Sequence, residues 1–210
     1  MSEAQVVELS FGVLGRELPA DHGYGLYSAI SHVCPELHEK DWWSLQTISG
    51  FRDGQGRIRL DKSSRMRIRL PVERLPVVNA LAGRELSIGI HRIRLTVPQL
   101  HLLQPRDILK ARLVVIKGFT EPDAFLEAAM RQFDALGIQA EALIDRDASG
   151  NPLRKTIKIR RFTVVGFGMC VLGLNAEDSL KLQIHGIGGK RRMGCGVFIP
   201  GPRKIVQKSA

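Results

Sequence analysis

The expected strands and helices follow the same order twice along the chain, and this repeat constrains the fold more than any other feature. The first half starts with an apolar stretch at 6–14, typical of a strand, and a helix at 24–33 whose residues Leu26, Ile30 and Val33 share one side. Turn residues separate the elements that follow. These are strands at 44–52, 57–61 and 65–70, a helix at 76–82 and a strand at 85–97.

The second half begins after residues 103–106 and repeats this order. An apolar strand at 109–116 precedes a helix that starts at Thr120-Glu121-Pro122-Asp123 and stops at Gly137. The remaining expected elements are strands at 141–145, 155–160 and 162–174, a helix at 176–184 capped by Asn175, and a strand at 197–200.

Each half therefore has the order strand, helix, two or more strands, helix, strand. This is the βαββαβ order of the ferredoxin-like, or RRM-like, motif. We predict an α+β protein with tandem ferredoxin-like domains at residues 1–105 and 106–210. The halves share a pattern and no clear sequence identity, so one larger α+β domain is the alternative.

The chain is strongly basic, with a formal charge of +10 and an isoelectric point near 10.0. This charge indicates an acidic partner, most economically nucleic acid, although a membrane surface would attract the same charge. No apolar run is long enough to span a bilayer, and the N-terminus lacks the pattern of a secretory signal. We therefore expect a cytoplasmic protein with no membrane partner.

Cysteine and histidine spacing gives no sign of a metal or disulfide framework. The three cysteines, Cys34, Cys170 and Cys195, are an odd number with no close pair. No His, Asp or Glu cluster has the spacing of metal ligands. We expect neither a metal nor a cofactor.

Residues 185–198 combine five glycines with three consecutive cations. Glycine lets a backbone adopt positive φ and bring its N–H groups close to a ligand, and the cations suit a polyanion. The spacing fits neither a P-loop nor a dinucleotide-binding fingerprint. A flexible basic turn is the alternative reading. The residues expected to contact the polyanion are Gly186, Gly188, Gly189, Lys190, Arg191, Arg192, Gly194 and Gly196.

Arginines alternate with apolar residues along the expected strands at 57–61 and 65–70. Because strand side chains alternate between faces, Ile58 and Ile68 can pack inward while the arginines share the outer face. This face is a second expected binding surface for the polyanion. Its members are Arg57, Arg59, Arg65, Arg67 and Arg69.

Two stretches resemble a known family. Residues 186–198 resemble the terminal glycine-rich loop of the CRISPR repeat-processing endoribonucleases of the RAMP superfamily, and the helix expected before the loop fits as well. Residues 18–30 resemble the start of that family's first helix. The resemblance is closest to the small myxan-type subtype.

The resemblance implies a function as well as tandem ferredoxin-like domains. A protein of this family cleaves a precursor CRISPR transcript within each repeat, without a metal, and leaves a 5′-hydroxyl and a cyclic phosphate. Its partners would be CRISPR repeat RNA, as precursor and mature crRNA, and subunits of a CRISPR effector complex. RNA is then the polyanion expected at the glycine-rich loop and on the arginine face.

Metal-independent cleavage of RNA needs groups that transfer protons, because the RNA supplies its own nucleophile, the 2′-hydroxyl. Imidazole suits this task at neutral pH. With the resemblance, His22 is the first candidate, since it precedes the helix beside Tyr24 and Tyr27, which could orient it or stack on a base. Otherwise His22 reads as a surface histidine near a helix cap. His32 is the second candidate, because it and His38 could approach the same cleft.

Two other functional classes stay open. A non-catalytic RNA-binding subunit of a CRISPR effector complex would share the fold, the loop and the charge. An RNA-binding module of the RRM type is the other, and the lack of an aromatic-rich strand argues against it. The adjacent residues Trp42 and Trp43 could stack on bases, yet such a pair is more often one packed and one half-exposed ring.

Overall fold

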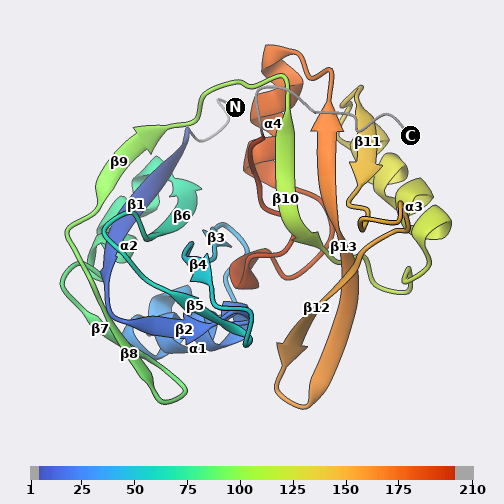
Figure 1. The fold of residues 1–210 in the computed structure, drawn as a ribbon. Coiled ribbons are helices and arrows are strands. Elements are labelled where there is room, and N and C mark those ends of the chain that lie inside the picture. The colour runs from blue at the N-terminus through green and yellow to red at the C-terminus, as the bar shows by residue number, and fades with distance from the viewer. Residues whose placement is uncertain (1–4, 202–210) are drawn as a thin grey trace. The chain divides into compact units, whose positions relative to one another are not determined.

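The computed structural model describes residues 5–201, which form a mixed α+β protein (Figure 1). The chain divides into two compact units. The first contains the described part of the chain up to Leu103 together with Ile157–Val164 and Lys190–Gly194. The second contains the rest, starting at Gln104. The domain limits expected at 1–105 and 106–210 stay a prediction.

The first unit is built on an antiparallel sheet in which β1 is a central strand. Across this sheet the order is β3 (Ser44–Gln46), β6 (Arg65–Pro71), β1 (Val6–Leu14), β8 (His91–Leu95) and β7 (Glu85–Ile88), with β9 (Gln99–Leu102) also paired to β1.

The core of this unit follows from strand alternation. Leu9 lies opposite Ile68 and Phe11 lies opposite Met66, and all four side chains are buried. Helix α1 (Gly23–Val33) adds the buried side chains of Leu26 and Ile30. The shorter helical elements of the unit are η1 (Pro35–Leu37), η2 (Val72–Arg74), α2 (Leu75–Asn79) and η3 (Arg191–Met193).

The same unit holds a second, three-stranded sheet. Its strands are β2 (Glu17–Pro19), β5 (Arg57–Arg59) and β4 (Phe51–Arg52), in that order. The expectation of one arginine face is therefore wrong. Arg57 and Arg59 lie in this small sheet, whereas the arginines of β6 lie in the large one. The residues between β5 and β6 turn the chain from the small sheet into the large one. Alternation within each strand does not reveal such a turn.

The second unit has a sheet with the order β11 (Glu141–Ile144), β13 (Phe162–Leu172), β10 (Leu109–Val114) and β14 (Phe198–Pro200), and β12 (Arg154–Ile159) also pairs with β13. The turn of the β12–β13 hairpin belongs to the first unit. Helices α3 (Pro122–Ala135) and α4 (Ala176–His185) share one apolar core with this sheet, in which the rings of Phe125 and Phe167 lie 4.8 Å apart. The side chain of Asn175 caps α4 as predicted, by accepting a hydrogen bond from the Asp178 N–H at 2.8 Å.

The large sheet of the first unit and the sheet of the second unit both have the strand order of the ferredoxin-like motif. If the four main strands of each half are numbered along the chain, their order across the sheet is second, third, first, fourth. The prediction of tandem ferredoxin-like folds is confirmed. No helix in the described part of the chain is long and apolar enough to cross a membrane.

Two expected strands are each divided in the structure. The strand expected at 85–97 is a hairpin, β7 and β8, that turns at Gly89 with φ 60°. The stretch expected at 44–52 contributes β3 to the large sheet and β4 to the small one. Both breaks depend on which strands pair in the folded chain, and the expected ranges did not include them.

Candidate functional site

One pocket of the first unit gathers most of the candidate histidine and tyrosine side chains. Its volume is about 490 Å³. Its walls come from α1 and the turn after it, from the β12–β13 turn, and from residues 190–193, all within the first unit. Its lining includes Tyr24, Tyr27, Ser31, His32, His38, Glu39, Arg160, Lys190 and Arg192.

Helical periodicity places the α1 side chains along this pocket. Leu26 and Ile30 face the core, and the stripe of Tyr24, Tyr27 and Ser31 lies on another side of the helix, as the sequence predicts. The Oγ atom of Ser31 is buried and has no hydrogen-bond partner among the described residues. A buried hydroxyl without such a partner is uncommon in folded proteins.

Tyr27 holds His38 in a defined orientation. The Tyr27 hydroxyl lies 3.3 Å from Nδ1 of His38, and the two rings stack with centroids 6.0 Å apart and planes 19° apart. The same hydroxyl accepts a hydrogen bond from the Glu39 N–H at 3.2 Å. Glu39 has φ 57°, a conformation that costs energy for a residue other than glycine and that recurs at functional sites.

The outer part of the His38 ring is open to solvent. Its side chain is 57% exposed, whereas Tyr27 is buried. The Glu39 carboxylate lies 3.8 Å from Nε2. Because Nδ1 is engaged by Tyr27, Nε2 is the ring nitrogen available to a bound molecule. Tyr27 itself has no free ring face for a base, since its surroundings also include the stacked Trp43 ring.

Arg192 supplies a fixed positive charge beside Tyr27. Its guanidinium lies 5.7 Å from the centre of the Tyr27 ring, within the range of a cation–π contact. Its Nη1 donates a hydrogen bond to the Lys40 carbonyl oxygen at 3.0 Å. Lys190, exposed and in the left-handed conformation at φ 65°, lines the same pocket.

The β12–β13 turn adds a third cation. Nε of Arg160 donates to the Tyr24 hydroxyl at 3.2 Å. The turn is fixed to the start of α1 by a hydrogen bond from the Lys158 N–H to the Asp21 carboxylate at 2.7 Å. Gly23 permits a close approach here, because any Cβ would collide with the Met193 carbonyl oxygen.

His22 is a buried histidine, not a surface one. It is 3% exposed. Its Nε2 accepts the Ile48 N–H at 3.0 Å, which leaves Nδ1 as the protonated nitrogen that donates to the Pro19 carbonyl oxygen at 2.7 Å. Both ring nitrogens therefore bind the backbone, and the alternative reading of His22 as a surface histidine is wrong. His32, in contrast, is exposed and lines the pocket.

The three consecutive cations of the glycine-rich loop do not share one surface. Arg191 is turned away from the pocket and lies near Arg69 and Asp41. Burial lowers the pKa of its guanidinium to about 10; the positive charge of Arg69 acts in the same direction, and Asp41 opposes it. Only Lys190 and Arg192 of the three line the pocket.

The loop glycines use their N–H groups within the protein. In the first unit the Gly194 N–H binds the Arg191 carbonyl. In the second unit the N–H groups of Gly186, Gly188, Gly189 and Gly196 bind oxygens of Leu182, Gln132, Val115 and Leu113. The expectation that these glycines present bare N–H groups is therefore wrong. All of them except Gly189 have a positive φ, between 58° and 82°, which glycine adopts without strain.

Most arginines of the expected sheet face are already engaged. Arg69 is buried and its Nε lies 2.9 Å from the Glu8 carboxylate, and Arg67 lies 3.4 Å from the same carboxylate. Arg65 donates to the carbonyl oxygens of Lys62 and Ser64, and Arg57 forms an ion pair with Glu17. Arg59 is exposed and forms no ion pair with any described residue.

Sequence reasoning gave too little weight to His38 and missed Arg160. The Tyr-x₂-Tyr spacing of α1 was a usable signal for the pocket wall, but the contact between Tyr27 and His38 depends on the turn after the helix. Arg160 carries no motif. Its positive φ of 55° marks it only once the backbone is known. Among the described residues, no group of three His, Cys, Asp or Glu side chains is arranged to hold a metal ion.

Comparison with known proteins places this chain in a family. The family model described as Cas6 Crispr matches residues 7–203. The CRISPR-associated endonuclease Cas6 of Myxococcus xanthus (strain DK1622) is 38% identical over 194 residues, which cover 92% of this chain and 81% of the relative.

Solved structures share the fold at low sequence identity. A CRISPR associated protein Cas6 aligns with a TM-score of 0.62 and 13% identity over 94% of this chain and 99% of its own. The product of a Cas6-related gene from Pyrococcus furiosus has the same TM-score with 14% identity, over 98% and 99% of the two chains. Thermus thermophilus Cse3, solved with an RNA representing a pre-cleavage complex, aligns with a TM-score of 0.54 and 12% identity over 94% and 100%. Because the family model matches nearly the whole chain and the Myxococcus relative is similar over most of both sequences, this protein belongs to the Cas6 family.

Proposed function

We propose that this Cas6 family member is an endoribonuclease that cleaves repeat RNA within precursor CRISPR transcripts to make guide crRNAs. The Myxococcus relative is a CRISPR-associated endonuclease, and the related Cse3 fold was solved with RNA. The formal charge of +10 suits a polyanionic substrate. The observation that carries the proposal is the cluster of Tyr27, His38 and Arg192 in one pocket.

In the proposed reaction, the 2′-hydroxyl of RNA attacks the adjacent phosphate. A bond forms between O2′ and phosphorus, and the bond from phosphorus to O5′ breaks. The 2′-hydroxyl loses a proton and the departing O5′ gains one. The products are a 2′,3′-cyclic phosphate and a 5′-hydroxyl, and every step can proceed through proton transfer and charge stabilisation.

His38 is the proposed proton-transfer group. Its Nδ1 is held by Tyr27, which acts as a positioning residue, and its Nε2 is on the exposed part of the ring. Imidazole has both protonation forms accessible near neutral pH, as this role requires. His32 lines the same pocket without a comparable orienting contact and stays the second candidate.

His22, the first candidate from the sequence, is not the proposed proton-transfer group. A proton-transfer group must reach the substrate, and His22 is buried with both ring nitrogens bound to the backbone. Arg192, Lys190 and Arg160 are the proposed partners of the phosphate, because their side chains bring positive charge to the walls of the pocket.

Replacement of His38 tests the assignment. The variant His38→Ala should bind repeat RNA with near wild-type affinity and cleave it at least about 10²-fold more slowly, the usual scale for a positioned proton-transfer group. The measurement is single-turnover cleavage of labelled repeat RNA at saturating protein, with His32→Ala as the matched control. A full rate in His38→Ala with a loss in His32→Ala would move the role to His32.

The same experiment distinguishes the enzyme from an RNA-binding subunit. If the wild-type protein binds repeat RNA tightly and produces no cleavage in any tested repeat, the endoribonuclease proposal is wrong. A non-catalytic binding role would then account for the fold and the charge.

A further inference from the structure

The three-stranded sheet presents an aromatic ring beside an arginine on its open face. Arg59 of β5 lies opposite Phe51 of β4 and opposite Glu17 of β2. Directly opposed residues of antiparallel strands have side chains on the same face, so these three form one row across the sheet. Phe51 is 69% exposed, whereas Leu18 and Ile58 are buried on the other face.

The local backbone builds this arrangement into the hairpin. Asp53 accepts hydrogen bonds from the N–H groups of Gln55 and Arg57 at 2.8 and 3.0 Å, and these bonds hold the pKa of its carboxyl below the usual range. At Gly50 a Cβ would lie 2.5 Å from the Arg59 carbonyl oxygen. Only glycine therefore allows the chain just before β4 to lie so close to β5. This contact fixes the backbone that carries Phe51.

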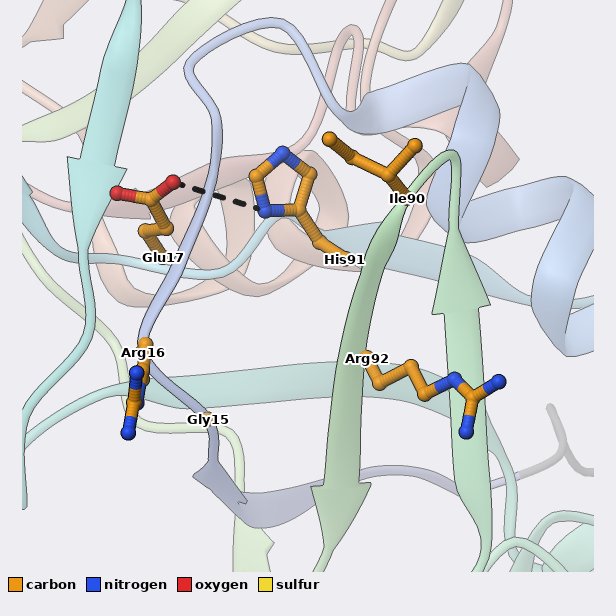
Figure 2. A pocket seen from close by; sticks show the side chains of 6 residues that line it. All are labelled: Gly15, Arg16, Glu17, Ile90, His91 and Arg92. Carbon is orange, nitrogen blue, oxygen red and sulfur yellow. Dashed lines mark ion pairs between the residues drawn. The ribbon is translucent and has the colours of Figure 1, made fainter.

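A shallow pocket of about 590 Å³ continues from the Glu17 end of the row (Figure 2). Figure 2 shows Glu17 and His91 pointing toward one another, with Nδ1 of His91 3.9 Å from the carboxylate. The same carboxylate lies 2.9 Å from Nη1 of Arg57. Arg59 forms no ion pair with any described residue, so its charge is available to a ligand.

We propose that the surface formed by Phe51 and Arg59, here named the sheet platform, binds a single-stranded segment of the substrate RNA. One base stacks on the Phe51 ring, and a neighbouring phosphate binds Arg59. The proposal rests on RNA being the substrate, as in the proposed function. An exposed ring beside an arginine that forms no ion pair with any described residue matches the two chemical parts of a nucleotide, its π-face and its phosphate.

The sheet platform is separate from the proposed cleavage pocket. Neither of its two residues lines the pocket that contains His38. It therefore contributes to holding the RNA and takes no part in the proton transfers. Loss of the platform should weaken binding and leave the rate of cleavage of fully bound RNA unchanged.

The test pairs protein variants with single abasic nucleotides in the RNA. The probe is repeat RNA made resistant to cleavage by one 2′-deoxy sugar at the scissile position. Phe51→Ala should bind it roughly 5- to 150-fold more weakly, the range for loss of one base–aromatic stack. Phe51→Trp should retain affinity. One abasic position should weaken binding to the wild type but cause no further loss in Phe51→Ala, because both changes remove the same contact.

A second measurement addresses the phosphate contact. Arg59→Ala should reduce the slope of log affinity against log salt by about 0.7, the value for one contact with a single strand. Arg84→Ala is the charge-matched control, since Arg84 is exposed in the same unit and lies outside the platform. It should leave the slope nearly unchanged.

Two outcomes would overturn the sheet platform. In the first, Phe51→Ala binds every RNA as the wild type does; if Arg59→Ala nevertheless weakens binding, the surface contacts duplex phosphates alone. In the second, no abasic position couples to Phe51. In each case wild-type cleavage of repeat RNA would still support the proposed function. If no repeat RNA is cleaved but an abasic position couples to Phe51, the endoribonuclease proposal is wrong and the sheet platform stands.

Discussion

His22 and His38 show how the surroundings of an imidazole decide what it can do. The ring of His22 joins the chain before α1 to Ile48 through two backbone hydrogen bonds, and the side chain is buried. The ring of His38 is held by Tyr27 at Nδ1, has the Glu39 carboxylate 3.8 Å from Nε2 and is more than half exposed. The first arrangement stabilises the fold, and the second leaves a nitrogen for chemistry.

Replacement of His22 should therefore lower stability. His22→Ala would leave the buried Ile48 N–H and the half-buried Pro19 carbonyl without their partner, at a cost of about 2–5 kcal/mol. Thermal unfolding would measure this as a loss of about 2–4 °C in Tm for each kcal/mol. His32→Ala is the control and should change Tm little, because His32 is exposed. An unchanged Tm in His22→Ala would contradict the structural role.

Arg191 and Arg192 are neighbours in sequence with different expected roles. Arg192→Ala should weaken RNA binding and reduce the log-salt slope by about 0.7, because Arg192 lines the pocket. Arg191→Ala should lower the free energy of unfolding by about 1–3 kcal/mol, since Arg191 is largely buried, and should leave the salt slope unchanged. Equal effects of the two variants on RNA binding would show that the loop acts as one cationic patch.

At the scale of elements, the glycine-rich loop is explained by geometry. Gly196 has φ 64°, and a Cβ there would collide with the Ile187 carbonyl oxygen. Gly189 lacks both constraints, since its φ is not positive and a Cβ would meet nothing within 4 Å. The fold therefore requires glycine at 196 but not at 189, so any need for glycine at 189 would come from a ligand.

The variants Gly196→Ala and Gly189→Ala test this explanation. We expect Gly196→Ala to lower Tm by several degrees or to prevent folding, because the backbone must move to admit the methyl group. Gly189→Ala should fold with wild-type Tm and bind repeat RNA normally. If Gly189→Ala folds normally and binds RNA poorly, the Gly189 backbone lies against the RNA, and the loop would have the contact role expected from its sequence.

Local pattern predicted much of the element order. The apolar stripe of α1 and the Asn175 cap are short-range features, and both are present in the structure. The division of 44–52 between two sheets was not predictable in this way, because it depends on which strands pair across the fold. For the same reason the sequence placed Arg57 and Arg69 on one face, although they lie in different sheets.

At the scale of the whole molecule, the twofold βαββαβ order was predictable because each half contains its own complete pattern. The candidate site was only partly predictable. Tyr24, Tyr27 and His32 line the pocket as a helix face would place them. The pairing of Tyr27 with His38 depends on the turn that follows α1, and Arg192 approaches Tyr27 from a segment distant in sequence. Helical periodicity encodes neither contact.

The central claim is that this protein cleaves repeat RNA with the RNA's own 2′-hydroxyl and with protein groups that transfer protons. The most direct measurement compares, in EDTA, cleavage of repeat RNA with cleavage of the same RNA carrying one 2′-deoxy sugar immediately 5′ of the scissile phosphate. We predict full cleavage of the first and none of the second, with nearly equal binding, because only one hydroxyl differs. A metal-activated water would need the ion and not the hydroxyl. Cleavage of the deoxy substrate, or loss of all cleavage in EDTA, would contradict the mechanism.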